Sequence, residues 1–301
     1  MRHLGWAQKT GLIQGEEASR RYLDSELADL AAYIFIDATG ADMDLMYDLT
    51  GWFFFFDDVF EVHPGQSPQS ALTAYQQMHT ILSSPPGPAP AGACTEVAAF
   101  ADIWQRETAG MSPRWVRRAA HNWADWIRSC LTEMADRLTG TTLSLNDYLA
   151  LRRHTVGMVP TLDAAQRGVH YQVPDIAYHH SHLQHLLGLA ADQISLVNDL
   201  YSLEKEEAVG NTNAVHCLMR TRRITRDAAI QATAELANAR ARAFIRYAEH
   251  LPALARSLGI TPAETDAVNR CVEHARLLMR AHSHWGFTLC SRYQQPPAAQ
   301  P

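Results

Sequence analysis

The chain has 301 residues, 47% of them hydrophobic, which is enough for a sizeable buried core. Its formal net charge is −6, and the Lys and Arg residues are scattered, which argues against a surface for nucleic acid or an anionic membrane. The five cysteines form no CxxC pair and the first residues lack an apolar signal core, so we expect a cytoplasmic protein without a membrane span, acting on a small molecule.

Apolar residues recur at three- and four-residue spacing along most of the chain, and no convincing alternating run interrupts them. This periodicity predicts helices over 15–35, 40–62, 68–83, 95–109, 113–138, 144–166, 176–206, 212–221, 225–249 and 262–289. Gly- and Pro-rich breakers separate these segments, and the composition of residues 294–301 predicts a disordered tail. The pattern predicts an all-α bundle with a single domain over residues 1–293.

An acidic cluster, Asp57-Asp58-x-x-Glu61, closes the helix predicted over 40–62. Asp57 and Glu61 are four residues apart and share a helical face, with Phe53 and Phe54 one turn earlier. A solvated helix end would explain the acidic residues alone. Aromatic residues in a row should be buried, however, and a carboxylate beside them needs a cationic partner. The cluster therefore predicts a metal site, with Asp57 and Glu61 as ligands.

A second polar cluster lies in the helix predicted over 176–206. Asn198, Ser202 and Glu206 follow i, i+4, i+8 spacing, so an amide oxygen, a hydroxyl and a carboxylate share one face. These are hard oxygen ligands of the kind that Mg²⁺ prefers. A polar helix terminus is the alternative interpretation, but two oxygen clusters that each close an apolar face together favour metal binding.

Together these motifs resemble the class I terpene synthases of the microbial type. In that family an aspartate-rich motif and an Asn/Ser/Glu triad hold three Mg²⁺ ions around a substrate diphosphate. The resemblance spans Phe53 to Tyr293 in family order. It implies a helical bundle around a central apolar cavity, and it implies an enzyme that ionises a linear prenyl diphosphate, cyclises the carbocation and releases diphosphate.

The resemblance also assigns basic residues to the diphosphate. The segment Arg152-Arg153-His154-Thr155-Val156-Gly157 is similar to the family's RRxTxG-like segment, and Arg153 lies 45 residues before Asn198, where the family has its diphosphate-sensing arginine. Further diphosphate ligands are implied at Lys205 and at the pair Arg292-Tyr293. Asp58 points about a third of a turn away from Asp57 and is expected to pair with Arg292.

The resemblance assigns the remaining positions to the cation. Phe53, Phe54 and Trp285 would offer aromatic faces to cationic carbon, and Gly157 would place a backbone carbonyl beside it. The other tryptophans, Trp104, Trp115, Trp123 and Trp126, are expected to pack between helices.

Substrate length and assembly stay open from the sequence. Farnesyl diphosphate is the expected substrate and a sesquiterpene the expected product, with geranyl or geranylgeranyl diphosphate as alternatives. A chain-elongating prenyltransferase matches less well because it carries a second DDxxD motif in place of the triad, and a di-metal carboxylate bundle would need Glu-x-x-His motifs that are absent here. A non-catalytic helical scaffold and a homodimer are further alternatives.

Overall fold

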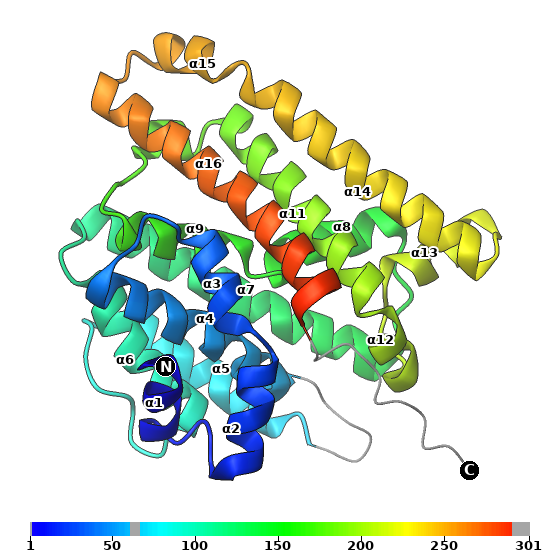
Figure 1. The fold of residues 1–301 in the computed structure, drawn as a ribbon, viewed down its shortest axis with the longest axis horizontal. Coiled ribbons are helices and arrows are strands. Elements are labelled where there is room, and N and C mark those ends of the chain that lie inside the picture. The colour runs from blue at the N-terminus through cyan, green and yellow to red at the C-terminus, as the bar shows by residue number, and fades with distance from the viewer. Residues whose placement is uncertain (1, 61–66, 291–301) are drawn as a thin grey trace.

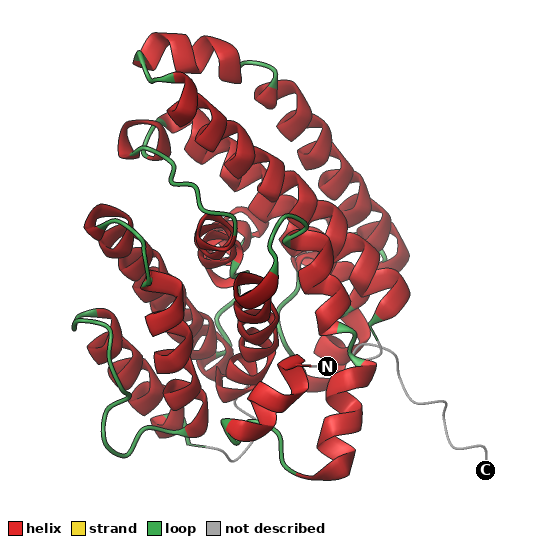
Figure 2. Cartoon of the chain, turned by 60° about the vertical axis from the view of Figure 1, so that its left-hand side comes forward, coloured by secondary structure: helices red, strands yellow, loops and turns green. Residues whose placement is uncertain are grey.

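The computed structural model describes residues 2–60 and 67–290, apart from the side chains of residues 58 and 209. Helices and loops make up this part of the chain, with no strand in it (Figure 2), and the all-α prediction is confirmed. The helices are α1 (Arg2–Lys9), α2 (Gly15–Asp24), α3 (Leu27–Ile34), α4 (Gly40–Phe60), α5 (Gln69–Leu82), α6 (Thr95–Thr108), α7 (Pro113–Thr139), α8 (Leu145–Thr155), α9 (Met158–Gly168), α10 (Asp175–Tyr178), α11 (Ser181–Tyr201), α12 (Leu203–Val209), α13 (Ala214–Arg222), α14 (Arg226–Ala248), α15 (Leu251–Leu258), α16 (Pro262–His284) and the π-helix η1 (Trp285–Leu289).

Helix α11 runs through the middle of the bundle, where it packs on α14, α16 and α8 (Figure 1). Helix α4 is central to the other half and packs on α1, α3, α6 and α9. Helix α7 contacts α5, α8 and α9 and so lies between the two halves. The long helices α4, α7, α8, α11 and α16 thus surround a common interior. None of the described helices is both long and apolar enough to cross a bilayer.

The aromatic run at Trp52–Phe56 serves two purposes because a helix points consecutive residues in different directions. Trp52 and Phe56 are fully buried and stack on each other with ring centroids 4.6 Å apart. They join Phe100 and Trp123 in an aromatic core between α4, α6 and α7. Phe53, on the adjacent face, is only partly buried, which leaves its ring available to a cavity.

Three predicted helices are broken by short turns. Residues 15–35 form α2 and α3, separated at Glu26, whose φ of +51° lies in the left-handed region. Residues 144–166 form α8 and α9, separated at Gly157 with φ +73°. Residues 176–206 form α10, α11 and α12, with a slight break at Ser202. The breaks at Gly157 and Ser202 both lie at the cavity described next.

Candidate active site

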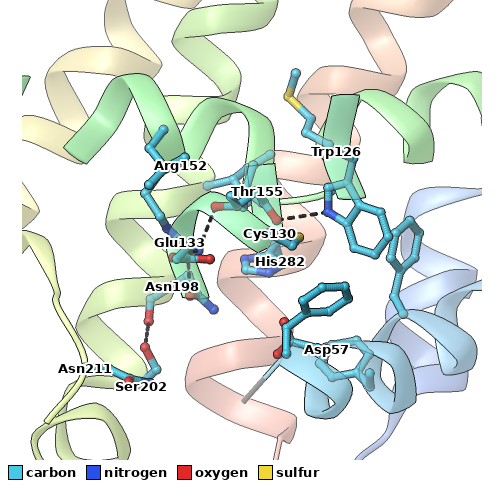
Figure 3. Close-up of a pocket in the computed structure, with 18 of the residues that line it drawn as sticks. Asp57, Trp126, Cys130, Glu133, Arg152, Thr155, Asn198, Ser202, Asn211 and His282 are labelled. Carbon is cyan, nitrogen blue, oxygen red and sulfur yellow. Dashed lines mark hydrogen bonds and ion pairs between the residues drawn. The ribbon is translucent and has the colours of Figure 1, made fainter. Parts of the chain in front are cut away.

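One cavity is lined by Asp57 of the predicted acidic cluster and by all three residues of the predicted triad (Figure 3). Helices α4, α7, α8, α9, α11, α12 and α16 all contribute to its wall. The apolar part of the lining includes Phe53, Phe54, Trp126, Ile194, Met158 and Leu278. The polar part includes Asp57, Arg152, Asn198, Ser202, Lys205 and Glu206.

The Asn198/Ser202/Glu206 triad keeps its helical alignment through the break between α11 and α12. The Ser202 amide donates to the Asn198 carbonyl (2.9 Å) and the Glu206 amide to the Ser202 carbonyl (3.0 Å), so the i to i+4 bonding continues. The Ser202 hydroxyl lies 2.9 Å from Oε1 of Glu206 and 2.7 Å from the Asn198 carbonyl, and its one proton can serve either acceptor. All three side chains therefore lie on the same wall of the cavity.

Glu206 sits in surroundings that disfavour its charge. Burial raises the pKa of its carboxyl to about 8, and the neighbouring carboxylate of Asp199 adds to the rise. Hydrogen bonds from Asn213 (2.5 Å to Oε2) and Ser202 oppose the shift without cancelling it. A nearby cation would lower the pKa of such a carboxyl group, because a positive charge stabilises the ionised form.

Asp57 lines the same cavity from the last turn of α4 and is exposed to it. The structure thus brings the first cluster's Asp57 and the whole triad together. Glu61, Arg292 and Tyr293 lie outside the described residues, and so does the side chain of Asp58. Their assignments stay predictions.

Arg152, rather than Arg153, reaches the cavity. Its Nη2 donates to Oδ1 of Asn198 (2.9 Å) and its Nη1 to the Thr155 hydroxyl (3.3 Å). Its guanidinium also lies 3.6 Å from Glu133 and 3.7 Å from the buried Asp199. Its side chain is only 13% exposed, so the charge is held in one place beside the triad.

Arg153 points to the other side of α8 and is absent from the cavity lining. Its Nε and Nη2 bind the two carboxylate oxygens of Asp192 at 2.6 and 3.0 Å, and Arg240 of α14 donates to the same carboxylate at 2.9 Å. Asp192 is buried at 1% exposure, so Arg153 is engaged in tying α8 to α11 and α14. The structure therefore brings Arg152 to the cavity and places Arg153, the residue predicted to bind diphosphate, outside the described lining.

Three aromatic residues were predicted to face the carbocation. Phe53 and Phe54 line the cavity, whereas Trp285 does not belong to the described lining. Trp285 is fully buried, donates from Nε1 to the Ser25 carbonyl (2.8 Å) and packs edge-on against Phe54 at 5.3 Å. It supports Phe54 from behind. Trp126 packs between helices as expected, with Phe56 of α4 at 5.6 Å, and it also lines the cavity and donates to the Thr155 carbonyl (3.1 Å).

The turn between α8 and α9 exposes backbone to the cavity, and two carbonyls in it differ. The Gly157 carbonyl accepts from both the amide (3.1 Å) and the hydroxyl (2.8 Å) of Thr161. The Val156 carbonyl has no i+4 amide to accept from, because residue 160 is a proline. A Cβ at Gly157 would lie 3.5 Å from Cε1 of Phe53, so this glycine also brings the turn close to the aromatic wall.

Several cavity residues were not identified from the sequence, among them Arg152, Val156, Trp126, Glu133 and His282. For Arg152 a signal was present, because the buried Tyr148 and Thr155 lie four residues before and three after it, on its face of α8. For His282, which is 84 residues from Asn198 along the chain, no local pattern pointed to this wall.

The donor set suits a hard divalent cation. One carboxylate from α4 and an amide, a hydroxyl and a carboxylate from α11 and α12 are all oxygen donors. No group of three or more His, Cys, Asp and Glu side chains in the described ranges is placed to hold a metal by itself. The triad depends on amide and hydroxyl oxygen, which favours Mg²⁺ over softer metals.

Comparison with known proteins agrees with this site. Residues 48–243 match the family "Terpene synthase family 2, C-terminal metal binding". The chain is 35% identical to (−)-β-caryophyllene synthase of Saccharothrix espanaensis, over 94% of this chain and 80% of that protein. It is 35% identical to pentalenene synthase of Streptomyces avermitilis, over 94% of this chain and 84% of that one.

The crystal structure of linalool/nerolidol synthase from Streptomyces clavuligerus, solved with 2-fluorogeranyl diphosphate, has a TM-score of 0.87 to this fold at 34% identity, covering 95% of this chain and 96% of that one. Fold and site thus define an α-helical enzyme that uses a divalent metal. The chain belongs to the microbial class I terpene synthases. It is a lyase that acts on a prenyl diphosphate, which sets aside the alternative of a non-catalytic scaffold.

Proposed function

We propose that this enzyme converts farnesyl diphosphate, with three Mg²⁺ ions, into a cyclic sesquiterpene hydrocarbon or alcohol and releases diphosphate. The observation that carries the proposal is that one cavity combines Asp57, the triad and Arg152 with apolar and aromatic side chains, among them Phe53, Phe54 and Trp126. The caryophyllene synthase relative, named as cyclising farnesyl diphosphate, supports the chain length. A cytoplasmic location belongs to the same proposal, and the wide spacing of the five cysteines, with no CxxC pair, favours it.

Geranyl diphosphate is the second candidate substrate. The linalool/nerolidol synthase that shares this fold was solved with a fluorinated geranyl diphosphate, so the architecture accommodates the shorter chain in that protein.

In this proposal Asp57, Asn198, Ser202 and Glu206 are the metal ligands, with Glu61 as a predicted further one. The metal ions, when bound, neutralise the negative charge that grows on the leaving diphosphate. The protein holds the four described ligands on the last turn of α4 and at the junction of α11 and α12, where all of them line one cavity. Oxygen donors of this kind are the ligands that Mg²⁺ prefers.

Arg152 takes the diphosphate role that the sequence assigned to Arg153. Its guanidinium is a planar fork of donors that suits phosphate oxygens, and it lies beside Asn198 within the cavity. Lys205, on the same wall, adds a point charge. Arg292 and Tyr293, with Asp58 as the partner of Arg292, remain predicted members of this group. As the carbon–oxygen bond breaks, these donors stabilise the departing diphosphate.

The rest of the cavity must keep water away from the carbocation until the final deprotonation or quenching. Phe53, Phe54 and Trp126 present π faces, whose negative quadrupole attracts cationic carbon. The Val156 carbonyl, whose i+4 position is occupied by a proline, takes the role of the backbone dipole beside the cation, since the Gly157 carbonyl accepts from the amide and hydroxyl of Thr161. Deprotonation by diphosphate or quenching by water then ends the reaction.

The decisive experiment incubates purified protein with Mg²⁺ and each of geranyl, farnesyl and geranylgeranyl diphosphate, followed by gas chromatography with mass spectrometry. We expect a cyclic fifteen-carbon product from farnesyl diphosphate. Acyclic products alone would refute cyclisation, and a preference for geranyl diphosphate would refute the substrate assignment. A further arm with isopentenyl diphosphate tests for chain elongation, which we expect to be absent. If no substrate released diphosphate, the proposed function would be wrong.

Two substitutions test the metal assignment. Asn198→Leu and Asp57→Ala should each abolish diphosphate release while leaving the far-UV circular dichroism helical, because each removes an oxygen donor without touching the core. Retained turnover in both variants would refute this set of ligands. Addition of EDTA should stop the wild-type reaction and excess Mg²⁺ should restore it.

A further inference from the structure

A hydrogen-bonded chain outside the assigned site ends on the triad. Tyr201, on the last turn of α11, places its hydroxyl oxygen 2.9 Å from Nδ2 of Asn198 and 3.0 Å from Nε2 of His282 on α16. Tyr201 itself is absent from the described cavity lining, whereas Asn198 and His282 belong to it. Any influence of Tyr201 on the cavity therefore passes through these two neighbours.

The orientation of the Asn198 side chain matters because a carboxamide has two different ends. Its oxygen can bind a cation, and its nitrogen, a hydrogen-bond donor, cannot. Arg152 has donors only, so its contact of 2.9 Å requires the amide oxygen on that side. The opposite end of the amide then faces Tyr201 and needs an acceptor there.

A tyrosine hydroxyl can either donate or accept, so Tyr201 fixes the amide only if its own proton is committed elsewhere. His282 provides the acceptor. Burial, and secondarily the charge of Arg152, lowers the pKa of His282 to about 4, so the ring is neutral near pH 7 and keeps a nitrogen lone pair. The hydroxyl proton of Tyr201 can then go to His282, which leaves its oxygen to accept from Asn198.

The position of the Tyr201 ring depends on Gly286. A Cβ built on Gly286 would lie 2.1 Å from Cε1 and 2.3 Å from Cδ1 of Tyr201, distances that no side chain tolerates. Gly286 lies in η1, the π-helical turn that follows α16, with Trp285 and Phe287 edge-on to the ring at 6.2 and 5.7 Å. The glycine thus creates a slot that the ring fills.

We propose that Tyr201, seated against Gly286 and bonded to His282, is a positioning residue that holds the Asn198 carboxamide with its oxygen toward the metal and the diphosphate. The proposal rests on the proposed function, since it assumes that Asn198 binds the metal. It gives Tyr201 and His282 a role in which they act through Asn198 and do not ligate the metal. Partners of this kind typically change metal affinity or activity about 10- to 100-fold when removed.

The test measures metal binding and turnover separately. Tyr201→Phe removes the hydroxyl and keeps the ring, so the Asn198 amide nitrogen loses its acceptor and Arg152 alone is left to orient the amide. We expect the Mg²⁺ concentration for half-maximal activity to rise about 10-fold, and calorimetric binding of Mg²⁺ with inorganic diphosphate to weaken by a similar factor. Phe287→Leu, which changes a neighbour that packs edge-on against the Tyr201 ring, is the matched control and should behave like the wild type.

His282 provides a second, independent pair of variants. His282→Gln keeps an acceptor for the tyrosine proton and should retain most of the Mg²⁺ affinity, whereas His282→Leu, of similar size, should lose it as Tyr201→Phe does. Because both residues act in one chain, the double variant Tyr201→Phe with His282→Leu should be no worse than either single one. A role limited to packing would not separate glutamine from leucine.

The outcomes separate this proposal from the proposed function. If Tyr201→Phe leaves Mg²⁺ binding unchanged while Asn198→Leu abolishes it, the positioning role is wrong and the metal assignment stands. If the wild type binds no Mg²⁺ with diphosphate and releases none from any substrate, the proposed function itself fails. Gly286→Ala should reproduce the loss of Tyr201→Phe; should it fail to fold, the tyrosine and histidine variants still decide the question.

Discussion

Arg152 and Arg153 are adjacent in the sequence and have different surroundings in the fold. The α-helix turns by about 100° per residue, which is enough to send Arg152 into the cavity and Arg153 to the buried carboxylate of Asp192 on the other side of α8. The two adjacent arginines therefore have different roles. Arg152 lies at the candidate site, and Arg153 holds α8 against its neighbouring helices.

Alanine substitutions should separate these two needs. Arg152→Ala removes a charge-assisted donor from the proposed leaving group, and we expect kcat to fall about 100-fold or more with little loss of helicity. Arg153→Ala leaves Asp192 with Arg240, so we expect a loss of stability of about 1–2 kcal/mol and near-normal turnover. Steady-state kinetics and urea unfolding of both variants check this. The reverse pattern would show that Arg153 is the diphosphate ligand.

At this scale the sequence predicted which residues carry the polar groups of the site better than it predicted which way neighbouring side chains point. Asp57, Asn198, Ser202, Lys205 and Glu206 all lie on the cavity because each sits on a helical face whose polar residues interrupt an apolar stripe. Such a pattern is local and can be seen in one sequence. The choice between neighbouring arginines depends on which face of α8 meets α11 and α7, and that is decided by packing.

At the scale of the elements, long helices were predictable and their interruptions were not. The helix over 113–138 appears as α7 (Pro113–Thr139) because Ser112 caps its start and Gly140 ends it, both recognisable residue types. The short helices α1 (Arg2–Lys9) and α15 (Leu251–Leu258) were missed, since two turns hold too few apolar positions to establish a period. The break at Gly157 was missed because flanking apolar residues keep helical spacing across it.

The break at Gly157 gives a prediction at this scale. Gly157→Ala forces a residue with a Cβ into the left-handed region, which costs about 1–2 kcal/mol, and it adds a methyl group 3.5 Å from Cε1 of Phe53 at the cavity. Gly140→Ala is a matched control, because it has a similar φ of +65° and open space around its Cβ. We expect similar losses of stability in urea unfolding, with kcat/KM reduced only in the first variant. Equal kcat/KM in both would show that this turn has no role in catalysis.

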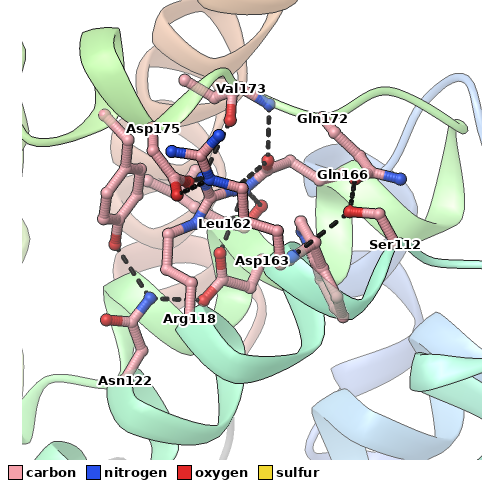
Figure 4. Close-up of polar contacts among 12 residues, drawn as sticks. Ser112, Arg118, Asn122, Leu162, Asp163, Gln166, Gln172, Val173 and Asp175 are labelled. Carbon is pink, nitrogen blue, oxygen red and sulfur yellow. Dashed lines mark hydrogen bonds and ion pairs between the residues drawn. The ribbon is translucent and has the colours of Figure 1, made fainter.

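At the scale of the whole molecule, a second buried polar cluster joins the helices away from the cavity. In Figure 4, Asn122 and Arg118 of α7 converge with Asp163 and Gln166 of α9 and with Asp175 of α10. Asp163 accepts from Asn122 (2.7 Å) and Gln166 (3.0 Å) and is 1% exposed. Asn122 lies 41 positions before Asp163 in the chain, whereas Gln166 lies on the same helix. A local sequence pattern therefore could not reveal this cluster.

The pKa of Asp163 predicts how stability depends on pH. Burial raises the pKa of its carboxyl from 3.8 to about 6, against the opposing effects of the Asn122 hydrogen bond and Arg118. The folded state then binds this proton more tightly than the unfolded chain does. The contribution of Asp163 to stability is therefore full below pH 4 and falls as pH rises to about 6, by roughly 3 kcal/mol.

Urea unfolding of the wild type and Asp163→Asn at several pH values measures this effect, since any loss of hydrogen bonding in the variant is the same at every pH. We expect the stability of the wild type relative to the variant to decline between pH 4 and pH 6 and to be constant above. Parallel curves for the two proteins would contradict the raised pKa.

The proposed ligand site joins helices that are far apart in the sequence, α4 near its start and α11, α12 and α16 toward its end. A ligand that binds there binds the folded chain and not the unfolded one, so it stabilises the fold by RT ln(1 + [L]/Kd), about 2.7 kcal/mol at one hundred times Kd. We expect Mg²⁺ and inorganic diphosphate together to raise Tm by several degrees, and either one alone to raise it much less. Asp57→Ala or EDTA should remove the increase. If diphosphate alone produced the full increase, or if Asp57→Ala kept it, the metal would not bridge α4 to the triad and the two clusters would not form one site.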